Sequence, residues 1–493
     1  MRSPWRTHSC VPCRDSSRHA GQYTAATGIE TSLDAARTSA CATVRLLALL
    51  LALPLSSAAA SLKVRLQPSV TKTTVEMPLE TYVAAALAGE ASVLRSGEAL
   101  KAMAVAARTY AIYYRGRHAA EGYDLCGTTH CQRLDQNAVT PRIEAAVDAT
   151  LGELLWYRGK PAFACYSRNC GGVTEDAGAV WPALAAPYLK SHPDPYCTPS
   201  GWQWSANSMD LVKALRNSKL QTPPEIHQID VAQRTASGRA QVLILSGAGT
   251  PIRISASSFR FAVGRELGWN LVRSDRFEVQ GLVFQGTGEG HGVGLCQRGA
   301  DQMGIEGRGY REILAFSYPG TVTGLTGRGL SWNRLAGETI ALMTTRPDSD
   351  RAVLDLAQRE LRAVTERTNL ASPARIEIRL YPDVETFRNA TGEPGWVAAY
   401  TTGNRIQMQP LATPRPTLRH ELLHVLVETQ ARAGMPLWFR DGLVGYLEGS
   451  GGAHRVAELV NRYGEGAVLG WLKTGLPREV TNARATAATT KSK

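Results

Sequence analysis

The sequence predicts α+β folds arranged in two main domains. Three observations support this interpretation. Stretches with alternating apolar residues, typical of strands, occur together with stretches of helical apolar spacing. Residues 319–337 are Gly-rich and without pattern, which indicates a linker. The length of 493 residues is enough for two or three domains.

The N-terminal half begins with strand and helix signals. Residues 61–70 (SLKVRLQPSV) alternate and predict a strand, and residues 77–92 (MPLETYVAAALAGEAS) predict a helix that ends near Gly89. Ser96 is the expected N-cap of a second helix, with Glu98 in its first turn. The apolar residues of this second helix recur at helical spacing: Leu100, Met103, Ala104, Ala107, Ala111 and Tyr114.

Turn signals divide the following segments into short strands. Arg158-Gly159 separates ELLWYRG from KPAFACYS in the manner of a hairpin. Residues 200–280 alternate polar helical stretches with β-rich ones, including RAQVLILSG and RFEVQGLVFQG. A Gly-rich loop, GTGEGHGVGLCQRGA, then leads into a helix.

The C-terminal part predicts a second α+β domain. DSDRAVLDLAQRELRAVTERT is an amphipathic helix, ARIEIRLYP a strand and WVAAYTTGNRIQMQP a hairpin with a Gly-Asn turn. RHELLHVLVETQ predicts a further helix. The expected organisation is an extension (1–43), a signal peptide (44–60), a first domain (61–320), a linker (321–337), a second domain (338–470) and a disordered tail (471–493).

The N-terminal region predicts export. Residues 44–60 (VRLLALLLALPLSSAAA) place one arginine before a short apolar run and small residues after it, as in a secretory signal peptide. The run is too short to span a bilayer comfortably, so no transmembrane segment is expected after cleavage. We interpret residues 1–43 as a mis-called start, with Val44 as the initiator; a genuine N-terminal extension is the alternative.

The charge balance points to anionic partners without selecting one. The formal net charge is +12, and the sequence contains no nucleic-acid-binding motif, so we expect no nucleic-acid partner. Export would place the cysteines beyond residue 60 in an oxidising compartment, where disulfides compete with metal binding for each of them.

Glu90 is the first candidate for chemistry. It follows the apolar run AAALAG, and a poorly solvated carboxyl keeps its proton to higher pH, as a general acid requires. Position alone is weak support, because an ordinary surface glutamate at a helix end has the same spacing.

Six motifs in order give a more specific signal. LETYVAAALAGEAS, ALKAMAVAARTYA, DLCGTTHCQ, CGGVTEDAGAVW, APYLKSHPDPYC and GEGHGVGLCQRGA lie between residues 77 and 319. This pattern resembles the stage II sporulation protein D family, the amidase-enhancer-like lytic transglycosylases. The resemblance covers roughly half of the chain and places the family's catalytic glutamate on Glu90.

The resemblance implies cleavage of peptidoglycan glycan strands without water. Ordinary glycosidases pair two carboxyl groups. A lytic transglycosylase instead uses the C6 hydroxyl of the substrate, so one residue protonates the leaving oxygen and then accepts the hydroxyl proton. The implied product is a 1,6-anhydromuramoyl end, the implied substrate is a strand stripped of stem peptides, and a cell-wall amidase is an implied partner.

Several residues match family positions that line the glycan groove. Those expected are Arg108, His291 and Gln297, with Ser167 and Trp181 as weaker candidates. Alternatives remain for three of them: Arg108 in a salt bridge on the helix surface, the GHGVG loop around His291 as a simple turn, and Trp181 in the core.

Two cysteines and two histidines predict a structural zinc site. His118, Cys126, His130 and Cys131 offer the thiolate and imidazole ligands that Zn²⁺ prefers, and four protein ligands close a site. The set matches family members that hold zinc, with His118 at a slightly longer spacing. A Cys126–Cys131 disulfide is the alternative.

The other distal cysteines have less defined roles. Family position implies a disulfide between Cys170 and Cys197. Cys165 and Cys296 either pair or stay buried, and four cysteines allow three connectivities.

The C-terminal domain contains an HExxH motif. His420 and His424 fall on one helix face, where both imidazoles can reach one Zn²⁺, and Glu421 occupies the position of a general base. Residues 338–465 resemble the gluzincin-like peptidases, whose third ligand is usually a glutamate. Here Asp441 stands at that position, and Glu448 is the fallback.

We therefore predict an exported enzyme that joins a lytic transglycosylase domain to a zinc-peptidase-like domain, with a periplasmic, extracellular or cell-wall location. Two alternatives stay open. In one, the zinc peptidase carries the main activity and the first domain docks on glycan. In the other, the protein binds the wall or enhances an amidase without catalysis.

Overall fold

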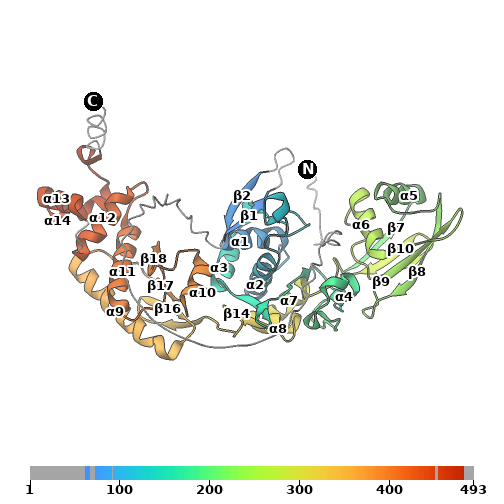
Figure 1. Ribbon diagram of the computed structural model, residues 1–493, viewed down its shortest axis with the longest axis horizontal. Helices are drawn as coiled ribbons and strands as arrows, with labels where there is room; N and C mark the ends of the chain where they lie inside the picture. The colour runs from blue at the N-terminus through green and yellow to red at the C-terminus, as the bar shows by residue number, and fades with distance from the viewer. Residues whose placement is uncertain (1–60, 67–72, 92, 450–452, 482–493) are drawn as a thin grey trace, which may run out of the picture.

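The computed structural model describes residues 61–66, 73–91, 93–449 and 453–481, and the predicted extension and signal peptide lie outside these residues. The chain forms an arc of three bodies (Figure 1): a central α+β body, a β-rich lobe and a C-terminal α+β body. The expected fold class is confirmed, with 43% helix and 22% strand. No helix of the described residues is long and apolar enough to cross a membrane.

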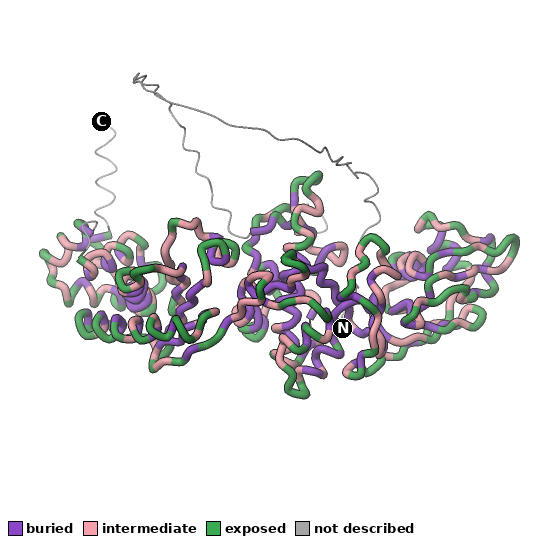
Figure 2. Tube along the Cα trace, turned by 60° about the horizontal axis from the view of Figure 1, so that its bottom comes forward, coloured by how far each residue is buried: buried purple, intermediate pink, exposed green. Residues whose placement is uncertain are grey.

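The central body is built around two adjacent helices. Helix α1 spans Leu79–Glu90 and α2 spans Gly97–Tyr113, with Ser96 accepting a hydrogen bond from the Ala99 N–H as the predicted N-cap. Both helices are rich in alanine, and α2 is buried along most of its length (Figure 2). Small side chains let neighbouring backbones approach: a Cβ on Gly304 would lie 2.0 Å from the Ser96 Oγ.

Further helices and three small sheets surround this pair. The helices are α3 (Pro141–Ala149), α4 (Ala177–Val180), α7 (Gln297–Ile305) and α8 (Tyr310–Ser317). The sheets are β2-β1-β3 (Thr74–Pro78, Ser61–Arg65, Leu125–Cys126), β14-β4-β5 (Val322–Gly324, Leu154–Tyr157, Lys160–Pro161) and β13-β6 (Leu295–Cys296, Tyr166–Ser167). The turn between β4 and β5 has positive φ at Arg158 and Gly159, which confirms the predicted hairpin.

The β-rich lobe is an insertion between the sixth and thirteenth strands. It contains the sheets β11-β12-β7 (Phe277–Gln280, Val283–Thr287, Gly201–Ser205) and β10-β9-β8 (Ile252–Ser255, Ala240–Gly247, Ile226–Arg234). Helices α5 (Ser208–Asn217) and α6 (Ala256–Glu266) complete it, and it has an apolar core of its own. The lobe lies at one end of the arc, on the side away from the C-terminal body.

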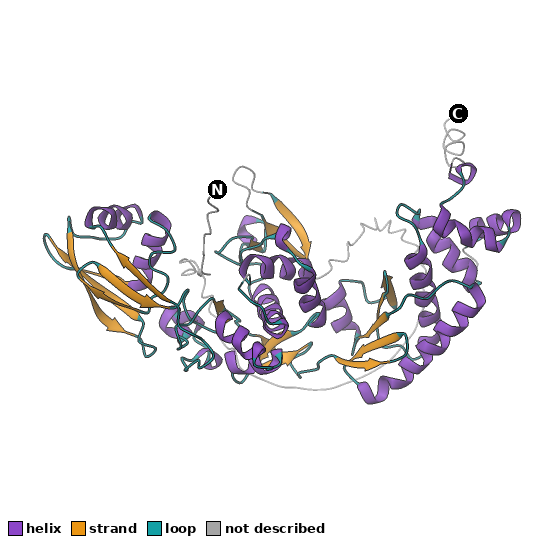
Figure 3. Cartoon of the chain, turned by 180° about the vertical axis from the view of Figure 1, so that it is seen from behind, coloured by secondary structure: helices purple, strands orange, loops and turns teal. Residues whose placement is uncertain are grey.

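The C-terminal body has one five-stranded sheet. Its order is β15-β16-β17-β19-β18 (Asn333–Ala336, Ile340–Thr344, Ile376–Leu380, Arg405–Met408, Ala399–Thr402). Its helices, drawn clearly from behind in Figure 3, are α9 (Pro347–Thr368), α10 (Val384–Thr391), α11 (Pro414–Gln430), α12 (Leu437–Glu448), α13 (His454–Tyr463) and α14 (Glu465–Thr474). The predicted amphipathic helix, strand, Gly-Asn hairpin and HExxH helix are therefore present.

Two sequence boundaries differ from expectation. The expected linker contains β14, which pairs with β4, and all of β15, which pairs with β16. These strands have three and four residues, too few for the alternation of apolar and polar residues to be recognised. Residues 471–474, expected in the tail, belong to α14; residues 482–493 lie outside the described chain.

The central and C-terminal bodies share an interface. Arg405 forms an ion pair with Asp148 at 2.8 Å, and the Trp332 indole N–H donates to the Leu151 carbonyl at 3.1 Å. A small apolar cluster also joins the two bodies: Leu151, Leu325, Trp332, Tyr381 and Phe387.

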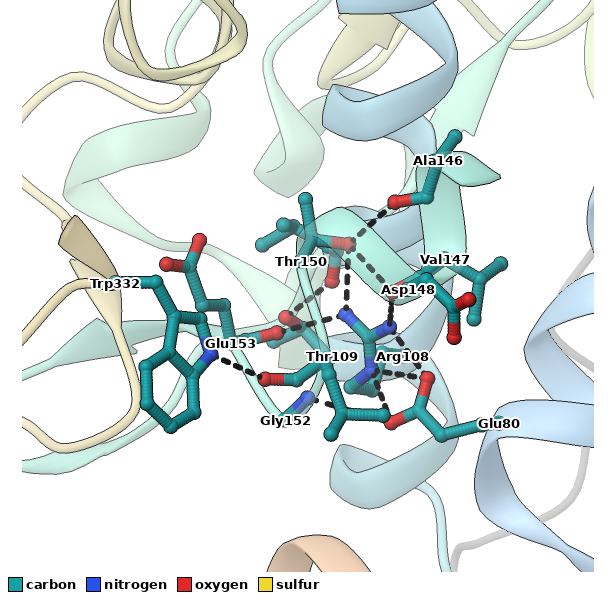
Figure 4. A network of polar contacts seen from close by, with 12 residues as sticks. Glu80, Arg108, Thr109, Ala146, Val147, Asp148, Thr150, Gly152, Glu153 and Trp332 are labelled. Atoms are coloured by element: carbon teal, nitrogen blue, oxygen red, sulfur yellow. Dashed lines mark hydrogen bonds and ion pairs between the residues drawn. The ribbon is translucent and has the colours of Figure 1, made fainter. Parts of the chain in front are cut away.

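A buried ion pair fixes α1 against α2 (Figure 4). Arg108, in α2, is fully buried, and its guanidinium contacts both carboxylate oxygens of Glu80 in α1, at 2.9 and 2.6 Å. Its remaining N–H groups donate to the carbonyls of Val147 and Glu153 and to the Thr150 hydroxyl. All of the guanidinium's donors are thus engaged within the core.

Replacing Glu80 by alanine is expected to leave the Arg108 charge buried without its partner. Breaking a buried pair in this way costs about 3–5 kcal/mol of unfolding free energy. Arg308→Ala, which removes an exposed ion pair with Glu312, is the matched control and should cost less than about 1 kcal/mol. Urea denaturation measures both, and equal losses would contradict the structural role of the buried pair.

Candidate functional site

Glu90 is the last residue of α1 and lies half-buried at its C-terminal end. The Arg133 backbone N–H donates to its Oε1 at 2.8 Å. The Gln297 side-chain N–H donates to the Glu90 main-chain carbonyl at 3.2 Å, across 207 residues of sequence. Segments that carry three of the sequence motifs therefore meet at this residue.

Gly89 makes that approach sterically feasible. A Cβ at this position would lie 2.1 Å from the Arg133 carbonyl oxygen, so any side chain would push the two segments apart. The preceding turns of α1 are buried from Tyr82 to Leu87. Glu90 thus places a carboxyl group directly beyond an apolar helix, as its sequence position predicts.

Ser167 and Gln297 lie on two adjacent short strands or at their ends. β6 and β13 pair in parallel, with Ser167 opposite Cys296, and Gln297 begins α7 immediately afterwards. Both side chains are buried. Within the described part of the chain, the Ser167 Oγ and the Gln297 Oε1 have no hydrogen-bond partner. Buried polar atoms seldom stay unpaired, so these two oxygens are suited to meeting a ligand.

His291 and Trp181 form the adjoining aromatic pair. The two rings meet edge to face, with centroids 4.9 Å apart, and Trp181 is half-buried. The His291 Nδ1 accepts a hydrogen bond from the Val293 N–H at 3.0 Å. Burial, with the nearby charges of Arg260 and Arg239, lowers the pKa of His291 to about 3. His291 is therefore neutral near pH 7.

Arg108 does not reach this surface. Its side chain is 0% exposed, and its guanidinium is bound by Glu80 and by main-chain carbonyls. The expected groove position is wrong for this residue, and so is the alternative of a surface salt bridge. The helix pattern identified an arginine beside alanines but not the carboxylate that allows its burial.

His118, Cys126, His130 and Cys131 come together as one cluster. Their ligand atoms all lie within 4.8 Å of one another. The Cys131 Sγ is 3.5 Å from the His118 Nε2 and 3.6 Å from the His130 Nδ1, and the Cys126 Sγ is 3.5 Å from that same Nδ1. His118, the residue with the unusual spacing, is thus within reach of the other three.

The surroundings of this cluster suit a metal. The His118 Nδ1 is 2.8 Å from the Glu121 carboxylate, the outer contact that usually orients a ligating imidazole. A hydrogen bond from Cys131 lowers the pKa of Cys126 to about 3, and the same contact raises that of Cys131. Both cysteines are free thiols in this structure, so they are not joined as the alternative disulfide.

Cys170 and Cys197 are free thiols instead of a disulfide, and they are not alone. Cys296 and Asp194 lie with them, and the four ligand atoms are all within 4.8 Å of one another. Cys165 is buried elsewhere, with its Sγ 3.7 Å from the Val293 carbonyl oxygen. The pairing inferred from family position therefore describes only part of this cluster.

The HExxH residues lie on α11 and face α12. The rings of His420 and His424 are 4.8 Å apart, and the His420 Nδ1 is 3.0 Å from the Glu448 carboxylate. Asp441 is exposed. Among the described residues, no three ligand atoms that include these histidines lie within 4.8 Å of one another. Glu448, the fallback ligand, is thus the carboxylate in contact with His420.

Glu421 is held against the edge strand β18. The Thr401 hydroxyl donates to its Oε2 at 2.7 Å, and the side chain is buried. Burial raises the pKa of Glu421 and lowers that of His424. A carboxyl with a raised pKa beside two imidazoles has the properties of a general base for metal-activated water.

Two cavities lie in or next to the β-rich lobe. One, of about 870 Å³, is lined by residues of β7, β8, β11 and β12 together with Gly238 and Arg276. The other, of about 380 Å³, is lined by Arg168, Asn169, Ser200, Asn270, Arg273, Glu289 and Arg298. Two of these arginines directly follow Ser167 and Gln297 in sequence. Glu90 lines neither cavity.

Three contributors were not identified from the sequence. Arg133 acts through its backbone, which no side-chain pattern reveals. Thr401 is recognisable only once β18 is placed beside α11. Asp194 lies three residues before Cys197, within APYLKSHPDPYC, and this spacing was the one available signal.

Comparison with known proteins agrees with the first half of this description. Residues 68–157 match the family described as SpoIID, stage II sporulation protein. An uncharacterized protein of Brachyspira hyodysenteriae is 34% identical over 50% of this chain and 66% of its own length. The amidase enhancer of Bacillus subtilis is 28% identical over 45% of the chain and 37% of its own length. Stage II sporulation protein D of Bacillus amyloliquefaciens is 27% identical over 50% of the chain and 73% of its own length.

The chain therefore spans just under two thirds of the first of these relatives and little more than a third of the second. The similarity of this chain to each relative covers about half of the residues of this chain.

The buried His291 predicts a pH-dependent stability. Its folded pKa of about 3 lies below the ordinary 6.5, so the unfolded chain binds a proton that the folded chain does not. The unfolding free energy should fall as the pH drops from 6.5 toward 3, by up to about 1.4 kcal/mol per pH unit. In His291→Asn this contribution disappears, and the fall between pH 7 and pH 5 becomes smaller by about 2 kcal/mol.

Urea denaturation at the two pH values measures the difference. His227→Asn, at an exposed histidine, is the matched control. Identical behaviour of the two variants would show that folding does not lower the pKa of His291.

Proposed function

We propose that this protein is an exported cell-wall enzyme that cleaves peptidoglycan glycan strands by transglycosylation, with Glu90 as the acid and base. The observation that carries the proposal is the meeting of three distant motif segments at Glu90. Arg133 fixes its carboxyl and Gln297 its main chain. The segment 68–157, which matches the SpoIID family, includes Glu90.

The reaction needs only one protein carboxyl group. The Glu90 carboxyl donates its proton to the bridging glycosidic oxygen as the bond from that oxygen to C1 breaks. The C6 hydroxyl of the same muramoyl residue then forms the new bond to C1 and passes its proton to the Glu90 carboxylate. The carboxyl is regenerated, no water is consumed, and the product ends in a 1,6-anhydro ring.

The neighbouring residues are suited to hold the glycan. The unpaired oxygens of Ser167 and Gln297 accept hydrogen bonds from sugar hydroxyls, and Trp181, braced by His291, offers a face for a sugar ring. The preference for strands without stem peptides, and cooperation with a cell-wall amidase, belong to this proposal. The name of the Bacillus subtilis relative, amidase enhancer, supports the latter.

His118, Cys126, His130 and Cys131 are proposed to hold a structural Zn²⁺. Two thiols and two imidazoles form a closed donor set with no position left for substrate. The loop from residue 116 to 133 ends at the backbone N–H that holds Glu90. A metal here would fix that loop and contribute no step of the reaction.

Glu90→Gln should abolish formation of anhydromuramoyl ends. Glutamine is nearly isosteric but cannot transfer a proton, and loss of general acid–base catalysis costs about 10²–10⁴-fold in rate. The measurement is mass spectrometry of the products from purified strands without stem peptides. Glu144→Gln, at an exposed glutamate of α3, is the matched control and should retain activity.

Wild-type activity retained by Glu90→Gln would refute the assignment of this residue. Hydrolysed, non-anhydro ends from the wild type would refute the transglycosylase chemistry. Binding of strands with no product from any variant would favour a wall-binding or amidase-enhancing protein without catalysis.

A second candidate function belongs to the C-terminal body, for which we propose zinc binding and cleavage of wall peptides. The supporting observation is the buried Glu421, held by Thr401 of the edge strand beside His420 and His424. Glu448 is the proposed third ligand because it already contacts His420. Asp441 remains the alternative by motif position.

Zinc analysis of the purified protein tests both proposed metal sites. His420→Ala and Cys126→Ser should each lose one equivalent of zinc relative to the wild type, because each variant removes a ligand. Glu421→Gln should keep its zinc and lose cleavage of stem peptides. Unchanged zinc in His420→Ala would refute the C-terminal site, and unchanged peptidase activity in Glu421→Gln would refute its general base.

A further inference from the structure

A second thiol cluster includes Cys296, the residue just before Gln297, whose side chain contacts Glu90. It contains Cys170, Asp194, Cys197 and Cys296, all of them buried. They come from three separate segments: the loop after β6, the loop before β7 and the end of β13. Neither the transglycosylase reaction nor the zinc site at Cys126 uses any of these groups.

The donor set and the spacing suit one tetrahedral metal ion. The three sulfurs and one carboxylate oxygen lie within 4.8 Å of one another. A tetrahedral site with Zn–S bonds of about 2.3 Å has edges of about 3.8 Å, so a small contraction would bring all four ligands onto one Zn²⁺. Thiolates select zinc over hard cations such as Mg²⁺ or Ca²⁺.

The Cys296 sulfur already receives two backbone hydrogen bonds. Its Sγ accepts hydrogen bonds from the Cys170 N–H at 3.3 Å and from the Gly299 N–H at 3.4 Å. The second donor belongs to the first turn of α7, where the helix dipole stabilises negative charge. Such N–H contacts are the outer shell that metal-bound ligands normally have.

Asp194 is the one carboxylate in this cluster, and a carboxylate is rarely buried without a partner of opposite charge. It is 2% exposed, and it accepts hydrogen bonds from the Tyr196 N–H and the Cys170 thiol. Among the described residues, no Lys, Arg or His forms an ion pair with it. Its carboxylate packs tightly against α7, since a Cβ on Gly299 would lie 2.4 Å from the Oδ2. A buried carboxylate without a cation is costly, and a bound metal ion would supply the missing positive charge.

The number of thiols argues against a simple disulfide. A bond between any two of the three cysteines would leave the third as a buried thiol beside a carboxylate. In this structure Cys170 donates to the Asp194 Oδ2 at 3.2 Å and Cys197 to the Asn169 Oδ1 at 3.3 Å. Binding of Zn²⁺ would replace the thiol protons and release them to solvent.

We propose that Cys170, Asp194, Cys197 and Cys296 form a second structural zinc site, with three thiolates and one carboxylate as ligands. The site clamps together the segments that carry Ser167 and Gln297, since these residues are close neighbours of Cys170 and Cys296 in sequence. Arg239, from the β-rich lobe, donates to the carbonyls of Cys170 and Val173 and offsets part of the negative charge of the ligands.

Zinc content of the full-length chain is the first test. Cys197→Ser should lose one equivalent of zinc, and so should Asp194→Asn in competition with a chelator. Cys165→Ser is the matched control, because Cys165 is an equally buried cysteine outside the cluster. The double variant Cys126→Ser/Cys131→Ser should keep the zinc of this cluster, and its cobalt(II)-substituted form should show thiolate-to-cobalt charge-transfer absorption.

Thiol labelling of the wild type provides a test that requires no variant. Three cysteines should resist alkylation in the folded, zinc-loaded protein: Cys170, Cys197 and Cys296. They should become labelled after a chelator is added without reductant. Labelling that requires reductant, with a mass corresponding to two linked cysteines, would overturn the proposal in favour of a disulfide. Equal zinc content in Cys197→Ser and Cys165→Ser would overturn it as well.

Discussion

The position of Glu90 depends on the buried ion pair between Arg108 and Glu80. This pair ties the first turn of α1 to the middle of α2 and to the turn after α3. Glu90 lies at the other end of α1, so the pair fixes the axis along which its carboxyl is presented. Alanine-rich packing then lets α2 and α7 approach closely, and α7 supplies Gln297. The ion pair between Arg108 and Glu80 thereby helps to fix the position of Glu90 relative to Gln297.

The sequence predicted the elements of this fold better than their connections. Strong periodicity identified α2, α9 and α11, and turn chemistry identified the hairpins at Arg158-Gly159 and Gly403-Asn404. The strands β14 and β15 were expected to be linker because three or four residues carry no readable period. Their pairing is set by the sheets they join, which is tertiary information.

The same division holds for the candidate sites. Motif order placed Glu90, Ser167, His291 and Gln297 in one region. Of these, Gln297 contacts the Glu90 main chain, and Ser167, His291 and Gln297 are buried. Arg108 was misplaced because its burial depends on Glu80, which is 28 residues away. The Cys170–Cys197 pairing missed Cys296 and Asp194, since the approach of three loops cannot be read from spacing. In the C-terminal body, helical spacing correctly brought His420 and His424 together, whereas the carboxylate nearest to them depends on how α12 crosses α11.

The chain passes into the β-rich lobe and returns from it at two adjacent positions. The Gly288 N–H donates to the Ser200 carbonyl at 2.9 Å, so the two ends of the lobe are one hydrogen bond apart. A segment whose ends nearly touch adds little strain to its host, whatever its length. The lobe is therefore a module that can be lengthened, shortened or exchanged while the central body keeps its geometry.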